Sequence, residues 1–281
     1  MTEELSVLYV VPTPLGNLAD ITRRAEEVLR SVAWIAAEDT RHSAPLLKHL
    51  GASARTLPAH QHNEYEAAAR IVEKLQAGES VALISDAGTP GISDPGARMV
   101  AAVRAAGFRV VPLPGACAAT TAMSAAGLAD EQFLFHGFLP AKGGQRRQVL
   151  ESLRSLPAAL VFYEAPHRVL ETVADLAAIL GERTLVIARE LSKLFESIHS
   201  GPLTAASAWL QADSNRQRGE FVLIVSGAPV GGDDGEALRV LRLLLDDGLP
   251  VKQAARLAAA IAGAPKNAMY EQALAWKDAG Q

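Results

Sequence analysis

Short apolar runs rich in β-branched residues alternate with helical periodicity along the first half of the chain. We predict strands at Val7–Val11, Trp34–Ala37, Val81–Ser85 and Arg109–Val111, with a helix beginning near Ala97. This alternation of strand and helix is typical of an α/β domain whose sheet is at least partly parallel.

A second series of apolar runs follows the first. We predict strands at Phe133–Phe138, Ala159–Tyr163, Thr184–Ala188 and Phe221–Val225, and a helix over Arg168–Leu180. The pattern repeats the alternation of the first half, so we predict a second α/β domain.

The end of the chain has a different pattern. A glycine-rich, acidic stretch after Val225 has the composition of a connector. Helical periodicity then returns at 238–245, 251–262 and 267–276, broken by Gly248-Leu249-Pro250. We therefore predict an N-terminal α/β domain at 1–125, a C-terminal α/β domain at 126–228, a linker at 229–236 and a helix-turn-helix-like appendage at 237–281.

Composition narrows the class of protein. The 281 residues suffice for two or three folded units. We expect a cytoplasmic, non-membrane protein, because the start of the chain lacks a basic and apolar leader, no apolar run is long enough for a bilayer, and Cys117 is the single cysteine. The net charge of −4 gives no overall signature of nucleic-acid binding, so any RNA contact must be local.

The densest chemical signal is the segment Ser85–Gly96, which follows a predicted strand and precedes a predicted helix. Three glycines allow positive φ, two prolines stiffen the backbone, and Asp86 and Asp94 can accept hydrogen bonds from hydroxyl or amino groups. No glycine-lysine-serine/threonine motif follows, so a ligand without phosphates fits better than a nucleotide. The alternative is an ordinary strand-to-helix turn, for which twelve residues are long.

Two further turns follow strands of the first domain, at Pro12–Leu18 and at Pro112–Cys117. Ligands of α/β sheets bind beyond the carboxyl ends of strands, so the three loops are expected to converge on one pocket. Small residues fill 116–126, which favours either close approach to a ligand or tight packing of a helix on a sheet.

Titratable side chains form two clusters in the first domain. Glu38-Asp39-Thr40-Arg41-His42 follows a strand and is suited to positioning a substrate or moving protons. His60, His62 and Glu64 alternate, which is compatible with a metal site, with substrate contact or with a helix beginning at Asn63-Glu64. We expect no metal.

The second domain carries a further cluster and a basic stretch. Tyr163-Glu164-Ala165-Pro166-His167-Arg168 follows a strand. Residues 138–168 hold five lysines and arginines against two glutamates, so Lys142, Arg146 and Arg147 are candidates for the RNA backbone. The alternative is a solvated helix face.

Together these motifs resemble one family. They are Pro-Thr-Pro-Leu-Gly-Asn-Leu-Ala-Asp-Ile-Thr (12–22), Ala-Glu-Asp-Thr-Arg-His-Ser (37–43), Ser-Asp-Ala-Gly-Thr-Pro-Gly-Ile-Ser-Asp-Pro-Gly (85–96) and Tyr-Glu-Ala-Pro-His-Arg (163–168). In this order, and with the terminal helices, they resemble the ribosomal RNA small subunit methyltransferase I family over nearly the whole chain.

The resemblance implies the tetrapyrrole-methylase fold, with two α/β domains, S-adenosylmethionine in the cleft between them, and a homodimer. It implies transfer of a methyl group to the 2′-hydroxyl of a cytidine in the decoding region of 16S ribosomal RNA, free or within the small subunit. It places the cofactor contacts at Pro14, Leu15, Asp86, Ala87, Gly88, Thr89, Ile92, Ala116, Cys117, Tyr163 and Ala188.

Roles for the other polar residues are hypotheses. The candidates for acid-base chemistry are Glu38, Asp39, His60 and Glu164. The candidates for RNA contact are Arg41, His42, Lys142, Arg146, Arg147, His167 and Arg168. Two alternatives stay open: a methyltransferase of the same fold that acts on a tetrapyrrole or a protein, and a non-catalytic ribosome-assembly protein that binds RNA.

Overall fold

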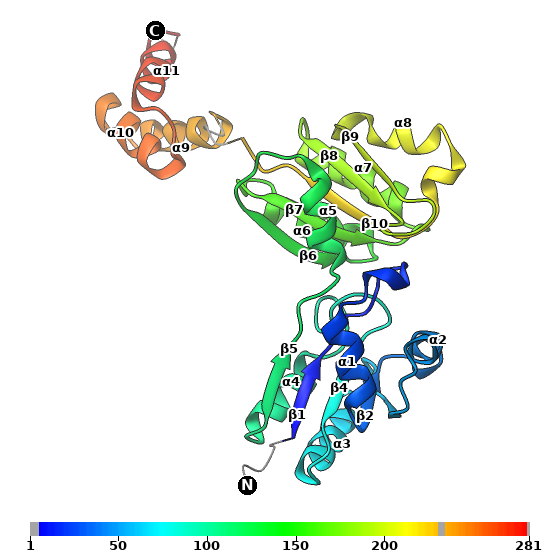
Figure 1. The fold of residues 1–281 in the computed structure, drawn as a ribbon. Helices are drawn as coiled ribbons and strands as arrows, with labels where there is room; N and C mark the ends of the chain where they lie inside the picture. Colours follow the sequence, from blue (N-terminus) through cyan, green and yellow to red (C-terminus); the bar gives the residue numbers. More distant parts are fainter. Residues whose placement is uncertain (1–5, 230–233, 280–281) are drawn as a thin grey trace.

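The computed structural model describes residues 6–229 and 234–279 (Figure 1). The first domain is built on a five-stranded, fully parallel sheet of order β3-β2-β4-β1-β5. Its strands are β1 (Val7–Val10), β2 (Trp34–Ala37), β3 (Arg55–Pro58), β4 (Val81–Ile84) and β5 (Arg109–Pro112). The four predicted strands are all present. The fifth, β3, was not predicted because Leu57 is its single buried residue, as befits a strand at the edge of the sheet.

Helices cover both faces of this sheet. On one face, α3 (Glu64–Gln76) and α4 (Ala97–Ala105) bury Ile71 and Met99 against the strands, and on the other α1 (Arg23–Ser31) and α2 (Thr40–Leu50) bury Leu29 and Leu47. Side chains cap the N-termini of α1 and α2. The hydroxyl of Thr22 accepts a hydrogen bond from the amide of Ala25, and the carboxylate of Asp39 accepts one from the amide of Arg41. The short turn η1 (Leu18–Asp20) follows β1.

The second domain holds a mixed sheet of order β6-β7-β10-β8-β9. Only β6 and β7 pair in parallel, and β10 runs antiparallel to both of its neighbours. Its strands are β6 (Phe133–Phe138), β7 (Ala159–Glu164), β8 (Thr184–Arg189), β9 (Ser197–Pro202) and β10 (Phe221–Val225). The polar edge strand β9 was not predicted, for the same reason as β3.

One face of the second sheet is covered by α6 (Gly143–Leu153), α7 (Val169–Leu180) and α8 (Ala206–Gln211). The turns η2 (Leu203–Ala205) and η3 (Ser214–Gln217) flank α8. The other face is covered by α5 (Ala118–Ala126), whose Ala119, Ala122 and Ala126 pack against strand residues such as Val161. The boundary predicted at 125/126 therefore needs correction, because the alanine face of α5 packs in the core of the second domain.

The appendage forms a small core of its own. It contains α9 (Asp234–Asp246), α10 (Val251–Ala262) and α11 (Lys266–Ala279), which meet around Leu241, Ala258 and Met269. Figure 1 shows it standing apart from the two sheets. The predicted linker at 229–236 lies in part outside the described residues, and its last three positions, 234–236, belong to α9. No helix in the described residues is long and apolar enough to cross a bilayer.

Candidate functional site

A cavity of about 390 Å³ lies between the two sheets. The loops that follow β1, β2, β4 and β5 contribute to it, together with the start of α5 and the ends of β6, β7, β8 and β10. The lining residues are Leu15, Glu38, Asp86, Ala87, Gly88, Thr89, Ile92, Asp94, Cys117, Ala118, Phe138, Tyr163, Glu164, Ala165, Pro166, Ala188, Leu191, Glu220, Phe221 and Val222. Nine of the residues that the resemblance assigns to the cofactor are among them; Pro14 and Ala116 are not.

Hydrogen bonds tie the three glycine- and proline-rich loops together. Thr13 and Gly88 exchange backbone hydrogen bonds of 2.9 and 3.0 Å, and the Thr13 hydroxyl donates to the carbonyl of Ser85 at 3.1 Å. The Thr89 hydroxyl donates to the carbonyl of Ala116 at 2.8 Å. The loops converge as predicted, and Ala116 shapes the pocket by fixing Thr89. Gly88, with φ +86°, adopts the left-handed conformation that glycine tolerates best.

Three carboxyl groups line one side of the cavity. The amide of Asp86 donates to the carboxylate of Glu38 at 3.4 Å, and the amide of Asp39 donates to that of Asp86 at 3.1 Å. Burial raises the pKa of Asp94 to about 6, and the charges of Glu38 and Asp86 add to this rise. Burial likewise raises the pKa of Glu38, although the hydrogen bond from the Asp86 amide lowers it in part. The three carboxyl groups are therefore suited to bind cations and hydroxyls, and Asp94 is suited to accept a proton near pH 6.

Asp39 serves a different purpose from Glu38. Its carboxylate caps α2 and pairs with the exposed guanidinium of Arg41 at 2.9 Å. The hydrogen bond from that guanidinium is the main reason why the pKa of Asp39 is lowered. Asp39 is absent from the cavity lining, so its position argues against a role as a base. His42 is exposed at the start of the same helix.

The ring centroids of His60 and His62 lie 6.2 Å apart, but these two residues and Glu64 form no metal-binding cluster. Residue 64 begins α3, so the helix-start interpretation is the correct one. The Glu64 carboxylate accepts from the amide of Gly96 at 3.0 Å and pairs with Arg98, which holds the end of the Ser85–Gly96 loop. His60 does not line the cavity. Among the described residues, no cluster of histidine, cysteine or carboxylate side chains is suited to a metal ion.

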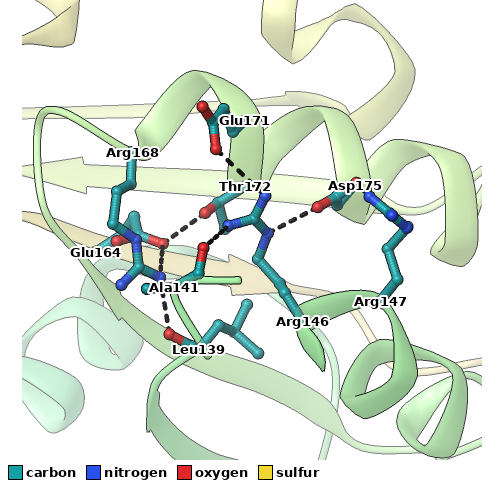
Figure 2. Close-up of polar contacts among 9 residues, drawn as sticks. All are labelled: Leu139, Ala141, Arg146, Arg147, Glu164, Arg168, Glu171, Thr172 and Asp175. Carbon is teal, nitrogen blue, oxygen red and sulfur yellow. Dashed lines mark hydrogen bonds and ion pairs between the residues drawn. The ribbon is translucent and has the colours of Figure 1, made fainter. Parts of the chain in front are cut away.

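Glu164 is enclosed in a hydrogen-bond network (Figure 2). Its carboxyl group accepts from the hydroxyl of Thr172 at 2.5 Å, from the guanidinium of Arg168 at 3.2 Å and from the amide of Ala165 at 2.8 Å, and its side chain is 0% exposed. Three donors and complete burial engage this carboxyl group within the fold, which argues against the acid-base role predicted for Glu164. Arg168 also donates to the carbonyl of Leu139 at 2.7 Å, so its guanidinium is engaged in holding the fold.

The basic stretch divides into buried and exposed groups. The side chain of Arg146 is 3% exposed and pairs with Asp175 at 2.7 Å and with Glu171 at 3.5 Å (Figure 2). Its burial overturns the prediction that it contacts an RNA backbone. Arg147 pairs with Asp175 at 3.2 Å but remains more than half exposed, and Lys142 and His167 are exposed.

Several lining residues were missed by sequence reasoning. Glu220, Phe221 and Val222 lie at the amino end of β10. Ligands of α/β sheets are expected beyond the carboxyl ends of parallel strands. Because β10 runs antiparallel to β7 and β8, its amino end faces the cavity instead. Phe138 follows the rule, since it ends β6 next to the parallel strand β7, and that signal was available in the sequence.

Comparison with known proteins gives the affiliation of the chain. The family model described as Tetrapyrrole (Corrin/Porphyrin) Methylases matches residues 7–207, and that described as RsmI C-terminal HTH domain matches residues 231–277. The ribosomal RNA small subunit methyltransferase I of Escherichia coli O157:H7 is 53% identical over 95% of this chain and 94% of its own length. The protein of the same name from Pseudomonas aeruginosa is 55% identical over 95% of this chain and 96% of its own length.

The chain belongs to the ribosomal RNA small subunit methyltransferase I family. Solved structures with the same fold include the methyltransferase CobJ, with a TM-score of 0.60 and 19% identity over 79% of this chain and 95% of that one. Another is a Thermus thermophilus uroporphyrin-III C-methyltransferase in complex with S-adenosyl homocysteine. It has a TM-score of 0.56 and 18% identity over 79% of this chain and 97% of its own chain. The tetrapyrrole-methylase fold predicted for this member of the ribosomal RNA small subunit methyltransferase I family is thereby confirmed.

Proposed function

We propose that this chain is a cytoplasmic S-adenosylmethionine-dependent methyltransferase of ribosomal RNA. Its substrate is the 2′-hydroxyl of a cytidine in the decoding region of 16S ribosomal RNA. The observation that carries the proposal is the near-full-length similarity to proteins named ribosomal RNA small subunit methyltransferase I, across both domains and the appendage. The carboxylate-lined cavity between the domains supports it.

The chemistry of the cavity fits this cofactor. S-adenosylmethionine combines a flat aromatic base with ribose hydroxyls, a carboxylate, an ammonium and a sulfonium, and it has no phosphate. Leu15, Tyr163 and Val222 supply apolar surface, while Asp86 and Asp94 supply acceptors for hydroxyls and cations. Among the described residues, no lysine or arginine lines the cavity, which suits a ligand without phosphates.

The bound cofactor supplies a methyl group that is already activated as a sulfonium. The protein then has to hold the ribose 2′-oxygen in line for attack, exclude water and accept the hydroxyl proton. Glu38 is the best-placed acceptor, because it lies in the cavity wall and burial raises the pKa of its carboxyl group above the ordinary value. Asp94 shares this wall and contributes a second, partly buried acceptor.

RNA contacts fall on the lysine, arginine and histidine side chains that remain exposed. Arg41 and His42 lie at the start of α2, next to Glu38 in the chain, and Lys142, Arg147 and His167 lie on the second domain. We assign these five residues to phosphates around the target nucleotide, since cationic side chains position a protein on a nucleic acid without reading its sequence.

We further propose a homodimer. Leu194 and Phe195 are 89% and 66% exposed, and they lead into the edge strand β9. Exposed apolar side chains at a sheet edge favour association with another protein surface, here a second copy. Sedimentation of the wild-type chain against Phe195→Ser and Leu194→Ser tests this assignment, with a shift toward the monomer expected for both variants.

The function is tested with tritiated S-adenosylmethionine and small ribosomal subunits from a strain that lacks the enzyme. We expect one labelled cytidine ribose in 16S ribosomal RNA. A methylase acting on a tetrapyrrole or a protein would leave the RNA unlabelled, and a non-catalytic RNA-binding protein would give no heat of S-adenosylmethionine binding in a titration calorimeter.

A further inference from the structure

Phe138 is an exposed aromatic residue in the wall of the cavity. Its side chain is 53% exposed, and of the large apolar residues that line the cavity only Ile92, at 39%, is also exposed. An exposed aromatic ring costs hydration free energy when nothing covers it. A ligand that covers Phe138 would remove this cost.

A bulge in β6 places the ring there. Phe135 pairs with Val161 and Phe138 with Tyr163, and the register shifts between Phe135 and Gly137. In a regular strand, positions 135 and 138 would lie on opposite faces. The bulge brings them to the same face, where both rings meet Tyr163 edge-on, at centroid distances of 4.9 and 5.7 Å.

The backbone around Phe138 is held from both sides. Gly137 has φ +80°, and a side chain there would meet the Ser93 hydroxyl. The loop that carries Ile92 therefore abuts β6 beside Phe138. On the other side, Arg168 donates to the carbonyl of Leu139 at 2.7 Å, and the Glu164 carboxylate holds Arg168 (Figure 2).

Tyr163 fixes one side of the Phe138 ring through their T-shaped contact. The amide of Ala119 donates to the Tyr163 hydroxyl at 3.0 Å, which fixes the tyrosine against α5. Phe138 remains 53% exposed, so this contact leaves much of its ring surface available. The result is a preorganised aromatic surface in the cavity that the carboxyl groups of Glu38 and Asp94 also line.

We propose that the base of the target nucleotide stacks on Phe138, beside Ile92, while its ribose enters toward Glu38. The inference rests on the proposed function and names the residue that orients the RNA substrate there. Proteins bind unstacked RNA bases on aromatic side chains, and such stacking tolerates any base. Phe138 therefore sets the position of the nucleotide and gives no preference for cytidine.

The test compares Phe138→Ala, Phe138→Trp and Phe133→Ala in the full-length chain. Phe133 is a matched control, because it is 46% exposed at the opposite end of β6 and does not line the cavity. Methyl transfer to small subunits from the strain lacking the enzyme gives kcat/KM, and calorimetry gives the Kd for S-adenosylmethionine.

We expect Phe138→Ala to lower kcat/KM for the subunits by about 5- to 150-fold, the range that loss of one base–aromatic stack predicts. The Kd for S-adenosylmethionine should stay within about twofold, and Phe138→Trp should restore most of the activity. Phe133→Ala should behave as wild type.

Three results would overturn the inference. Undiminished methyl transfer by Phe138→Ala would remove the stacking role, and an equal loss of S-adenosylmethionine affinity would assign the ring to the cofactor. Both leave the proposed function standing. If the wild-type chain itself leaves the subunits unlabelled, the proposed function fails, and the stacking assignment fails with it.

Discussion

At the scale of single residues, Glu38 and Asp39 show how neighbours in the chain take different roles. Glu38 lines the cavity, whereas Asp39 caps α2. We predict that Glu38→Gln lowers kcat by about 10²- to 10⁴-fold, the usual contribution of a general base, with little change in S-adenosylmethionine affinity.

Asp39→Ala should keep kcat within about twofold and lower the free energy of unfolding by about 1 kcal/mol. Single-turnover methyl transfer and urea unfolding measure the two effects, and equal losses of kcat in both variants would contradict the division of roles.

Asp94 makes a pH-dependent prediction. Its pKa is raised to about 6 from an ordinary value of 3.8, so the carboxyl group is protonated at pH 5 and ionised at pH 7. A cationic ligand favours the ionised form, so binding of S-adenosylmethionine should tighten as pH rises from 5 to 7 and should release protons near pH 6. The same upward shift means that ionisation of Asp94 opposes folding, so its contribution to stability declines as pH rises between 3.8 and about 6.

Calorimetric titrations in two buffers of different ionisation enthalpy measure the proton release from Asp94. Asp94→Asn keeps the size of the side chain and removes its titration, so its proton release near pH 6 should vanish. A wild-type binding curve that stays flat between pH 5 and 7 would show that Asp94 does not face the ligand.

At the scale of elements, the burial of a strand decides whether its sequence predicts it. Strands buried on both faces, such as β4 and β10, stand out as apolar runs and were predicted. The edge strands β3 and β9 bury little, so their sequences lack that signal. The three loops of the cavity were predictable because glycine and proline mark them and parallel strands align their carboxyl ends.

The roles of charged side chains were harder to predict than their positions. Glu164 and Arg146 occupy the segments where a site was expected, yet both are buried in pairs with partners on α7. A single sequence does not reveal that Asp175 will face Arg146 or that Thr172 will face Glu164, since the packing of α7 against α6 and β7 decides these contacts. For Phe138, the position at the carboxyl end of β6 was predictable, but the face of the sheet on which its ring lies was not, because a bulge and not the strand period sets that face.

The packing of α6 on α7 leads to a stability prediction. Arg146 is buried between the two helices and holds the carboxylate of Asp175. We expect Arg146→Ala to lower the free energy of unfolding by about 3 kcal/mol, at the low end for a broken buried ion pair because Arg147 still reaches Asp175. Lys142→Ala, an exposed neighbour, should change it by less than about 0.5 kcal/mol.

Urea unfolding of the two variants measures this difference, and the double variant Arg146→Met with Asp175→Leu should recover part of the loss. The salt dependence of small-subunit binding provides a separate check. If Arg146→Ala weakens the dependence of the binding constant on salt concentration and leaves the free energy of unfolding unchanged, Arg146 contacts the RNA backbone after all.

At the scale of the whole molecule, the appendage is a separate unit that closes its own core around Leu241, Ala258 and Met269. None of its residues within the described range 234–279 lines the cavity. We predict that a chain ending at residue 229 keeps its fold and its affinity for S-adenosylmethionine but has a KM for small subunits raised roughly tenfold or more, because a second tethered contact adds avidity. Calorimetry with the cofactor and initial rates against subunit concentration test the two halves of the prediction. An unchanged KM would remove the appendage from substrate binding, whereas loss of cofactor binding would mean that the appendage supports the fold of the two α/β domains.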